Sequence, residues 1–158
     1  MSNTNPPQDL SWLLEDFTRR VPGVMHVLLS STDGLKLAQA SLTTVQAEKV
    51  AAALSGLQSL SSALVDILEI TASPSGLKQV LVEHEGFMLC LMKVGQGLPV
   101  GHGNAGTDPR TVGTCLGVVV EPRADPGQIA YEAGLLSVSL GEYLSTPVRR
   151  GGAAASGR

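Results

Sequence analysis

The chain is poor in aromatic and charged residues. Of its 158 residues, 3% are Phe, Trp or Tyr and 16% are Asp, Glu, Lys or Arg. Soluble domains usually carry about 25% charged residues, so this chain has little charge with which to cover the surface of a monomer. We therefore expect part of that surface to be covered. The net charge of −3, with Lys and Arg mostly scattered singly, argues against a nucleic-acid-binding surface.

Sequence motifs for catalysis, metal binding and secretion are also missing. The chain has no C-x-x-C, H-x-x-x-H, P-loop or G-x-S-x-G pattern, so we expect no enzyme, no metal site and no cofactor. No basic segment followed by an apolar run opens the sequence, which predicts a cytoplasmic protein without a signal peptide. The two cysteines, Cys90 and Cys115, each lie in an apolar run and are expected to be buried and reduced.

One hexapeptide, GHGNAG at residues 101–106, matches the G-x-G-x-x-G pattern of dinucleotide-binding turns. That turn requires a preceding strand and a following helix, because the pyrophosphate binds at the helix N-terminus. Here Pro99 precedes the glycines, Pro109 follows them, and a strand-like run begins at Thr111. We predict a loop over 95–111 instead of a nucleotide site. Acting as a lid, this loop would suit an alternative function, a small-ligand sensor domain of profilin-like shape.

Apolar periodicity and turn signals predict the element order α-β-β-α-β-β-β-α. The predicted elements are a helix over 10–21, strands over 24–31 and 35–40, a helix over 43–69, strands over 77–84, 87–94 and 111–121, and a helix over 125–144. The small, polar and Pro/Gly-rich ends, 1–8 and 147–158, are expected to be disordered tails around one domain over 9–146.

Short local signals set the boundaries of these elements. Pro22-Gly23 predicts a type II turn, and Asp33-Gly34 predicts a type I′ hairpin turn, in which both central residues have positive φ. Thr43 and Gln46 form the pattern of a capping box. Asp125, followed by a proline, is a strong helix start.

The helix predicted over 43–69 contains sixteen residues, 50–65, without a charge. A membrane span needs about 20 predominantly apolar residues; this run is shorter and includes several serines, so we expect no direct membrane insertion. A face running from Val50 through Leu54, Leu57 and Leu64 to Ile67 is expected to pack on the sheet.

Small residues occupy the remaining surface of this helix and would let another helix approach closely. That other helix is either one of the chain's own or a second copy across a two-fold axis. The edge strand over 77–84 supports the second copy, because an uncovered edge can pair with its symmetry mate. The predicted dimer interface consists of Ala52, Ser55, Gly56, Ser59, Ala63, Val80 and Val82.

Two segments resemble the ends of a known domain family. LSWLLEDFTRRVPGVMHVLLSSTDGLKLA, at 10–38, resembles the start of a Roadblock (dynein light-chain) domain. DPGQIAYEAGLLSVSLGEYLSTPVR, at 125–149, is similar to the end of actinobacterial members, the conservon Roadblock components. The resemblance covers roughly 9–148, although the loop over 95–111 is longer than the turn expected there.

The resemblance implies an α+β fold with a five-stranded antiparallel sheet between helices, profilin-like or longin-like in shape, which dimerises into a continuous sheet. It also implies a non-catalytic regulator or scaffold for a Ras-like small GTPase, in a bacterial signalling system with a sensor histidine kinase, recruited to the membrane by partners. A GTPase-facing surface around Ser55, Ser59 and Ser62 is a second interpretation of the small residues. Because 44–69 has no Arg, we expect no arginine finger from this helix.

Overall fold

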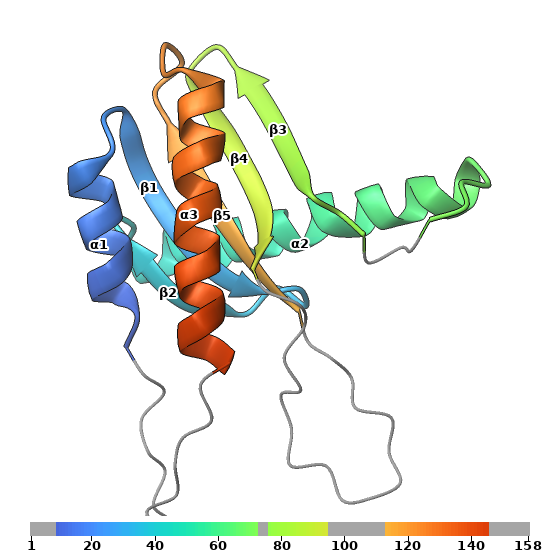
Figure 1. Ribbon diagram of the computed structural model, residues 1–158, viewed down its shortest axis with the longest axis horizontal. Coiled ribbons are helices and arrows are strands. Elements are labelled where there is room, and N and C mark those ends of the chain that lie inside the picture. Colours follow the sequence, from blue (N-terminus) through green and yellow to red (C-terminus); the bar gives the residue numbers. More distant parts are fainter. Residues whose placement is uncertain (1–8, 73–75, 95–112, 146–158) are drawn as a thin grey trace, which may run out of the picture.

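The computed structural model describes residues 9–72, 76–94 and 113–145 (Figure 1). The elements are α1 (Ser11–Arg20), β1 (Val24–Ser31), β2 (Lys36–Ala40), α2 (Thr44–Ile67), β3 (Gln79–His84), β4 (Phe87–Val94), β5 (Thr114–Val120) and α3 (Pro126–Ser145). All neighbouring strands are antiparallel, in the order β2-β1-β5-β4-β3. The predicted fold class and element order are confirmed. The predicted tails and the loop with GHGNAG lie outside the described residues.

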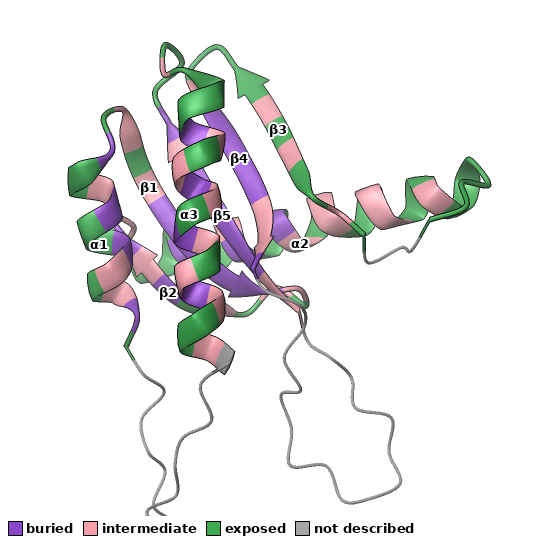
Figure 2. Cartoon of the chain, viewed as in Figure 1, coloured by how far each residue is buried: buried purple, intermediate pink, exposed green. Residues whose placement is uncertain are grey.

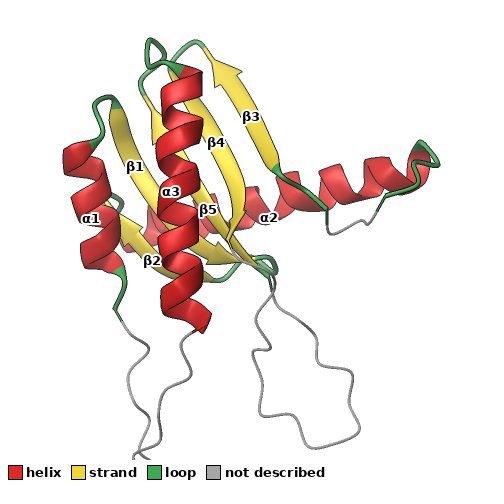
Figure 3. Cartoon of the chain, viewed as in Figure 1, coloured by secondary structure: helices red, strands yellow, loops and turns green. Residues whose placement is uncertain are grey.

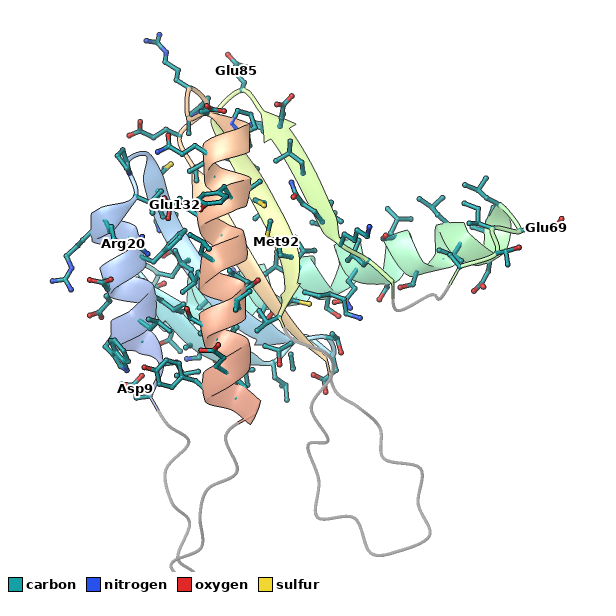
Figure 4. All side chains as sticks on the ribbon, in the orientation of Figure 1. Asp9, Arg20, Glu69, Glu85, Met92 and Glu132 are labelled. Carbon is teal, nitrogen blue, oxygen red and sulfur yellow. The ribbon has the colours of Figure 1, made fainter. Side chains whose placement is uncertain are left out.

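The sheet lies between two helical layers (Figure 3). On one face, α1 and α3 pack side by side, and the Arg20 guanidinium donates a 3.1 Å hydrogen bond to Glu132 Oε2 between them (Figure 4). The core of this layer includes Leu14 and Phe17 from α1. The predicted apolar face of α3 is also there, with Ile129, Ala133, Leu136 and Leu140 buried and Leu144 partly buried. On the opposite face, α2 buries Ala47, Ala51 and Leu54 against strands β1, β4 and β5.

Several predicted local signals are confirmed by specific contacts. The Gln46 N–H donates to Thr43 Oγ1 at 3.2 Å, and the Thr43 N–H donates to Gln46 Oε1 at 3.0 Å, which completes the capping box of α2. The Gly127 N–H donates to Asp125 Oδ1 at 2.9 Å at the start of α3. Gly23 has a φ of +86°, as the third residue of a type II turn requires.

The type I′ turn predicted at Asp33-Gly34 is wrong, although the hairpin itself exists. Only Gly34 has positive φ in this turn, at +92°, and the ladder shifts register at Ser30, which pairs with Lys36. The Ser31 hydroxyl donates to the Asp33 carboxylate and accepts the Leu35 N–H at 3.0 Å. These side-chain bonds stabilise a longer loop that replaces the two-residue turn.

The predicted sheet-facing stripe of α2 is only half correct. Val50, Leu54 and Leu57 do pack in the core beneath the sheet, whereas Leu64 is 44% and Ile67 is 69% exposed. The reason is length: α2 has 24 residues, which corresponds to about 36 Å at 1.5 Å per residue. Its second half projects past the edge of the sheet at β3 (Figure 1).

Candidate protein-interaction surface

The projecting half of α2 exposes many large aliphatic side chains. Figure 2 shows fully buried residues on this helix only in its first half, and Figure 4 shows carbon-only side chains at the end near Glu69. The exposed residues here and just beyond the helix are Leu60, Leu64, Ile67, Leu68 and Ile70. An apolar patch of this kind on a small domain marks a contact with another macromolecule.

Strand β3 is an open edge next to this helix. In the sheet it has a neighbour, β4, on one side only. Val80 and Val82 are half-buried on the α2 side, in the same apolar cluster as Leu57, and Leu81 is 42% exposed on the other face. An uncovered edge presents backbone groups that can pair with another strand. We call the second half of α2 (57–67) together with the outer edge of β3 the α2–β3 surface.

The predicted small residues of α2 differ in their surroundings. Ser55 is engaged within its own chain, because its hydroxyl donates to the Thr32 carbonyl at 2.8 Å. Its Cβ also lies 3.5 Å from the Cβ position of Gly34. Ala52, Gly56, Ser59 and Ala63 are exposed, and Ser62 is half-buried. The structure thus brings Val80 and Val82 close to the helix, while the small residues line its outer and hairpin-facing sides.

Nothing in the described part of the chain requires a glycine at Gly56. A Cβ at this position would meet no atom of the described residues within 4 Å, and its φ is not positive. A glycine inside a helix costs roughly 0.5–1 kcal/mol relative to alanine. An open glycine on an exposed, uncharged helix is the feature expected where another backbone approaches closely.

The described residues do not gather a set of side chains that could hold a metal ion. Among them, no three His, Cys, Asp or Glu side chains lie close enough together to hold a metal ion. Burial raises the pKa of both Cys90 and Cys115 to about 11, which makes them poor nucleophiles. Both thiols are free and buried, as predicted. The ligand-sensor hypothesis depends on 95–111 and stays a prediction.

By length and hydropathy alone, α2 also meets the requirements of a membrane span. Its contacts favour a protein environment. Leu54 is fully buried against the sheet, and the Cys115 thiol donates to Gln58 Oε1 at 2.7 Å. A lipid-embedded helix could not keep these contacts with its own sheet.

A second exposed apolar group, which the sequence did not reveal, lies on the outer side of α1 and α3. The Trp12 and Tyr143 rings meet edge to face there, with centroids 6.0 Å apart. The exposed residues are Trp12, Tyr131, Leu135, Val138 and Tyr143. The only signal for them in the sequence is that they fall between the core-facing positions of the two helices.

The family model of the Roadblock/LC7 domain matches residues 10–99. This chain belongs to the Roadblock/LC7 family. A solved Roadblock/LC7 domain from Streptomyces avermitilis is similar, with 30% identity and a TM-score of 0.69, over 88% of this chain and all of that one. No curated protein sequence matches the chain.

More distant structures share the Roadblock/LC7 fold. Myxococcus xanthus MglB has a TM-score of 0.65 at 13% identity, covering 85% of this chain and 94% of MglB. The Thermus thermophilus gliding protein MglB has a TM-score of 0.63 at 16% identity, covering 90% and 93%. The family model ends before β5 and α3, whereas these structural matches cover most of the described domain, so the last two elements belong to the same fold.

Proposed function

We propose that this Roadblock/LC7 protein is a non-catalytic, homodimeric regulator or scaffold of a Ras-like small GTPase in a bacterial signalling system. The observation that carries this proposal is the α2–β3 surface, an open edge beside an exposed apolar helix. The implied setting is a cytoplasmic complex that a sensor histidine kinase or another partner recruits to the membrane.

The dimer would use the α2–β3 surface on both copies. Val80 and Val82 of β3, with Gly56 and Ala63 of α2, belong to the proposed interface together with the exposed leucines. A stable dimer typically buries about 800 Å² on each partner. Among the described residues, nothing covers the outer edge of β3 or the exposed leucines of the projecting helix. Pairing of β3 with the partner's β3 would also leave neither of these edges free to pair with a further chain.

The GTPase would bind on the hairpin-facing side of α2, around Ser55, Ser59 and Ser62. This side is small and uncharged, so it can lie close to a partner's switch loops. Since α2 has no Arg, stimulation of hydrolysis would come from reshaping those loops, not from an inserted guanidinium. A large loss of activation in the variant Arg123→Ala, or in Arg110→Ala outside the described residues, would contradict this mechanism.

Capture of partners from a lysate of the source organism tests the proposal. Immobilised protein is loaded with lysate containing either a non-hydrolysable GTP analogue or GDP, and retained proteins are identified by mass spectrometry. We expect a small GTPase of Ras type to be enriched, and Ser62→Arg, which lies outside the predicted dimer interface, to reduce its capture while the dimeric mass is kept. Val45→Asp, at the start of α2, is the control that should retain capture. No GTPase in either nucleotide condition would remove the main support for this function.

A further inference from the structure

The open edge of β3 carries a side-chain pattern that fits one pairing with its own copy. Around a two-fold axis normal to the sheet, two copies of β3 would run antiparallel. Opposite residues must then share a face, because side chains alternate along a strand. This condition leaves three central registers, with the axis at Val80, Leu81 or Val82.

We propose that the axis passes through Leu81, an inference that rests on the homodimer of the proposed function. In this register, Val80 lies opposite the partner's Val82 on the face that α2 covers. On the other face, Leu81 meets the partner's Leu81, and the Gln79 amide lies opposite the partner's Glu83 carboxylate. Apolar groups therefore meet apolar groups, and a donor meets an acceptor. The Val80–Val82 and Gln79–Glu83 pairs each occur twice by symmetry, and the Leu81 pair occurs once, on the axis.

The other two registers oppose unlike groups. With the axis at Val82, Leu81 would face the partner's Glu83, and Val80 would face the partner's His84. With the axis at Val80, Val82 would face the partner's Lys78. Each mismatch would occur twice and would place a charged or polar group against an aliphatic side chain inside an interface.

Backbone geometry agrees with pairing at Leu81. His84 pairs with Phe87 across the two-residue turn at Glu85-Gly86, and such a closing pair is hydrogen-bonded in two-residue hairpins. Hydrogen-bonded and non-hydrogen-bonded pairs alternate along the two strands, so the backbone N–H and C=O groups of Gln79, Leu81 and Glu83 point away from β4, toward the open edge. Leu81 and the partner's Leu81 can therefore exchange two hydrogen bonds at the axis.

This axis also determines which side of α2 meets the partner's helix. Ser55 faces Thr32, near the end of the sheet where β3 begins. Leu57, about 200° further round the helix, points the other way, into a cluster with Phe87 and Val119. Rotation about Leu81 exchanges the two ends of β3, so the partner's α2 lies on the Phe87 side of this chain's α2. The side of α2 that contacts the partner's helix is then the leucine side, which includes Leu60 and Leu64.

Three single-cysteine variants distinguish the registers. In the proposed register, the Cα atoms of Leu81 and the partner's Leu81 are about 5.5 Å apart, within the 4.4–6.8 Å range of a disulfide. Residue 80 and the partner's residue 80 are diagonal neighbours at roughly 7–8 Å, as are the two residues 82. We expect Leu81→Cys to form a reducible covalent dimer on oxidation, whereas Val80→Cys or Val82→Cys alone does not.

The double variant Val80→Cys/Val82→Cys tests the same register through the opposite face, and it should also form a covalent dimer. Wild-type protein controls for the buried Cys90 and Cys115. Covalent dimers of Val80→Cys or Val82→Cys alone would overturn the register. So would a dimeric protein in which neither Leu81→Cys nor the double variant cross-links. A monomeric mass of the wild type by light scattering would instead refute the homodimer itself.

Discussion

Gly117, in the central strand β5, lies directly beneath α2, and a side chain there would disturb the packing of this helix on the sheet. A Cβ at this position would lie 2.6 Å from Leu54 Cδ1 and 3.2 Å from Leu54 Cδ2. Leu54 is fully buried, so it cannot swing into solvent, and it must shift by about 0.8 Å to restore ordinary contact. We expect Gly117→Ala to lower the free energy of unfolding by about 1–3 kcal/mol, the usual cost of overpacking a core.

Urea unfolding followed by far-UV circular dichroism measures this loss, at one fixed protein concentration because dimerisation contributes to stability. Leu54→Ala removes the clashing atoms and alone should cost about 2–5 kcal/mol. In the double variant, the loss of unfolding free energy should be smaller than the sum of the losses in the two single variants. Gly134→Ala in α3 is the control, because its Cβ would meet no described residue within 4 Å. It should stabilise the protein by roughly 0.5–1 kcal/mol. A neutral Gly117→Ala, or strict additivity with Leu54→Ala, would refute the reasoning.

The contacts described above lead to four further predictions. Leu64→Asp should shift the mass measured by light scattering toward the monomer, because it places a charge in the proposed interface, whereas Val45→Asp at the far end of α2 should not. Thr43→Ala should lower the free energy of unfolding by about 1 kcal/mol in urea titrations through loss of the capping box, and Thr43→Ser should retain most of it. Burial raises the pKa of Cys90 and Cys115 from 9.0 to about 11, so at pH 8 a thiol reagent should label the native protein roughly 100-fold more slowly than urea-unfolded protein. For the same reason, the free energy of unfolding should fall as the pH rises from 9.0 toward about 11, where the unfolded chain loses these protons first.

Signals that act over a few residues predicted the fold well. The capping box at Thr43 and the helix start at Asp125 depend on side chains that bond to backbone within three residues, so the sequence contains all the partners. The apolar periods that gave the order of the elements are equally local. The hairpin at Asp33-Gly34 was predicted correctly, but its turn type was wrong, because Ser31, just outside the expected turn, bonds to the same backbone groups.

The interaction surface was only partly predictable, because it depends on where the sheet ends. The uncharged run over 50–65 does lie within one helix, but much of it is exposed in the described chain, so its burial against a second copy stays a prediction. The mixed polarity of 77–84 correctly indicated an edge strand. Neither pattern reveals that α2 extends past the edge of the sheet and leaves Leu64 and Ile67 exposed among the described residues. The same limit applies to Gly117, whose close approach to Leu54 joins residues far apart in the sequence.

An exposed edge strand beside an apolar helix favours aggregation unless only certain strands can pair with it. The charges along β3 limit which strands can pair. Lys78 precedes the strand, and Glu83 lies near its other end. Parallel, in-register pairing of two copies would set Lys78 beside the partner's Lys78 and Glu83 beside the partner's Glu83, which is unfavourable. Antiparallel pairing about Leu81 separates both like-charged pairs and places each Glu83 opposite an amide. The charges that protect this edge from indiscriminate association therefore also favour the arrangement in which the exposed leucines of the two α2 helices can cover one another.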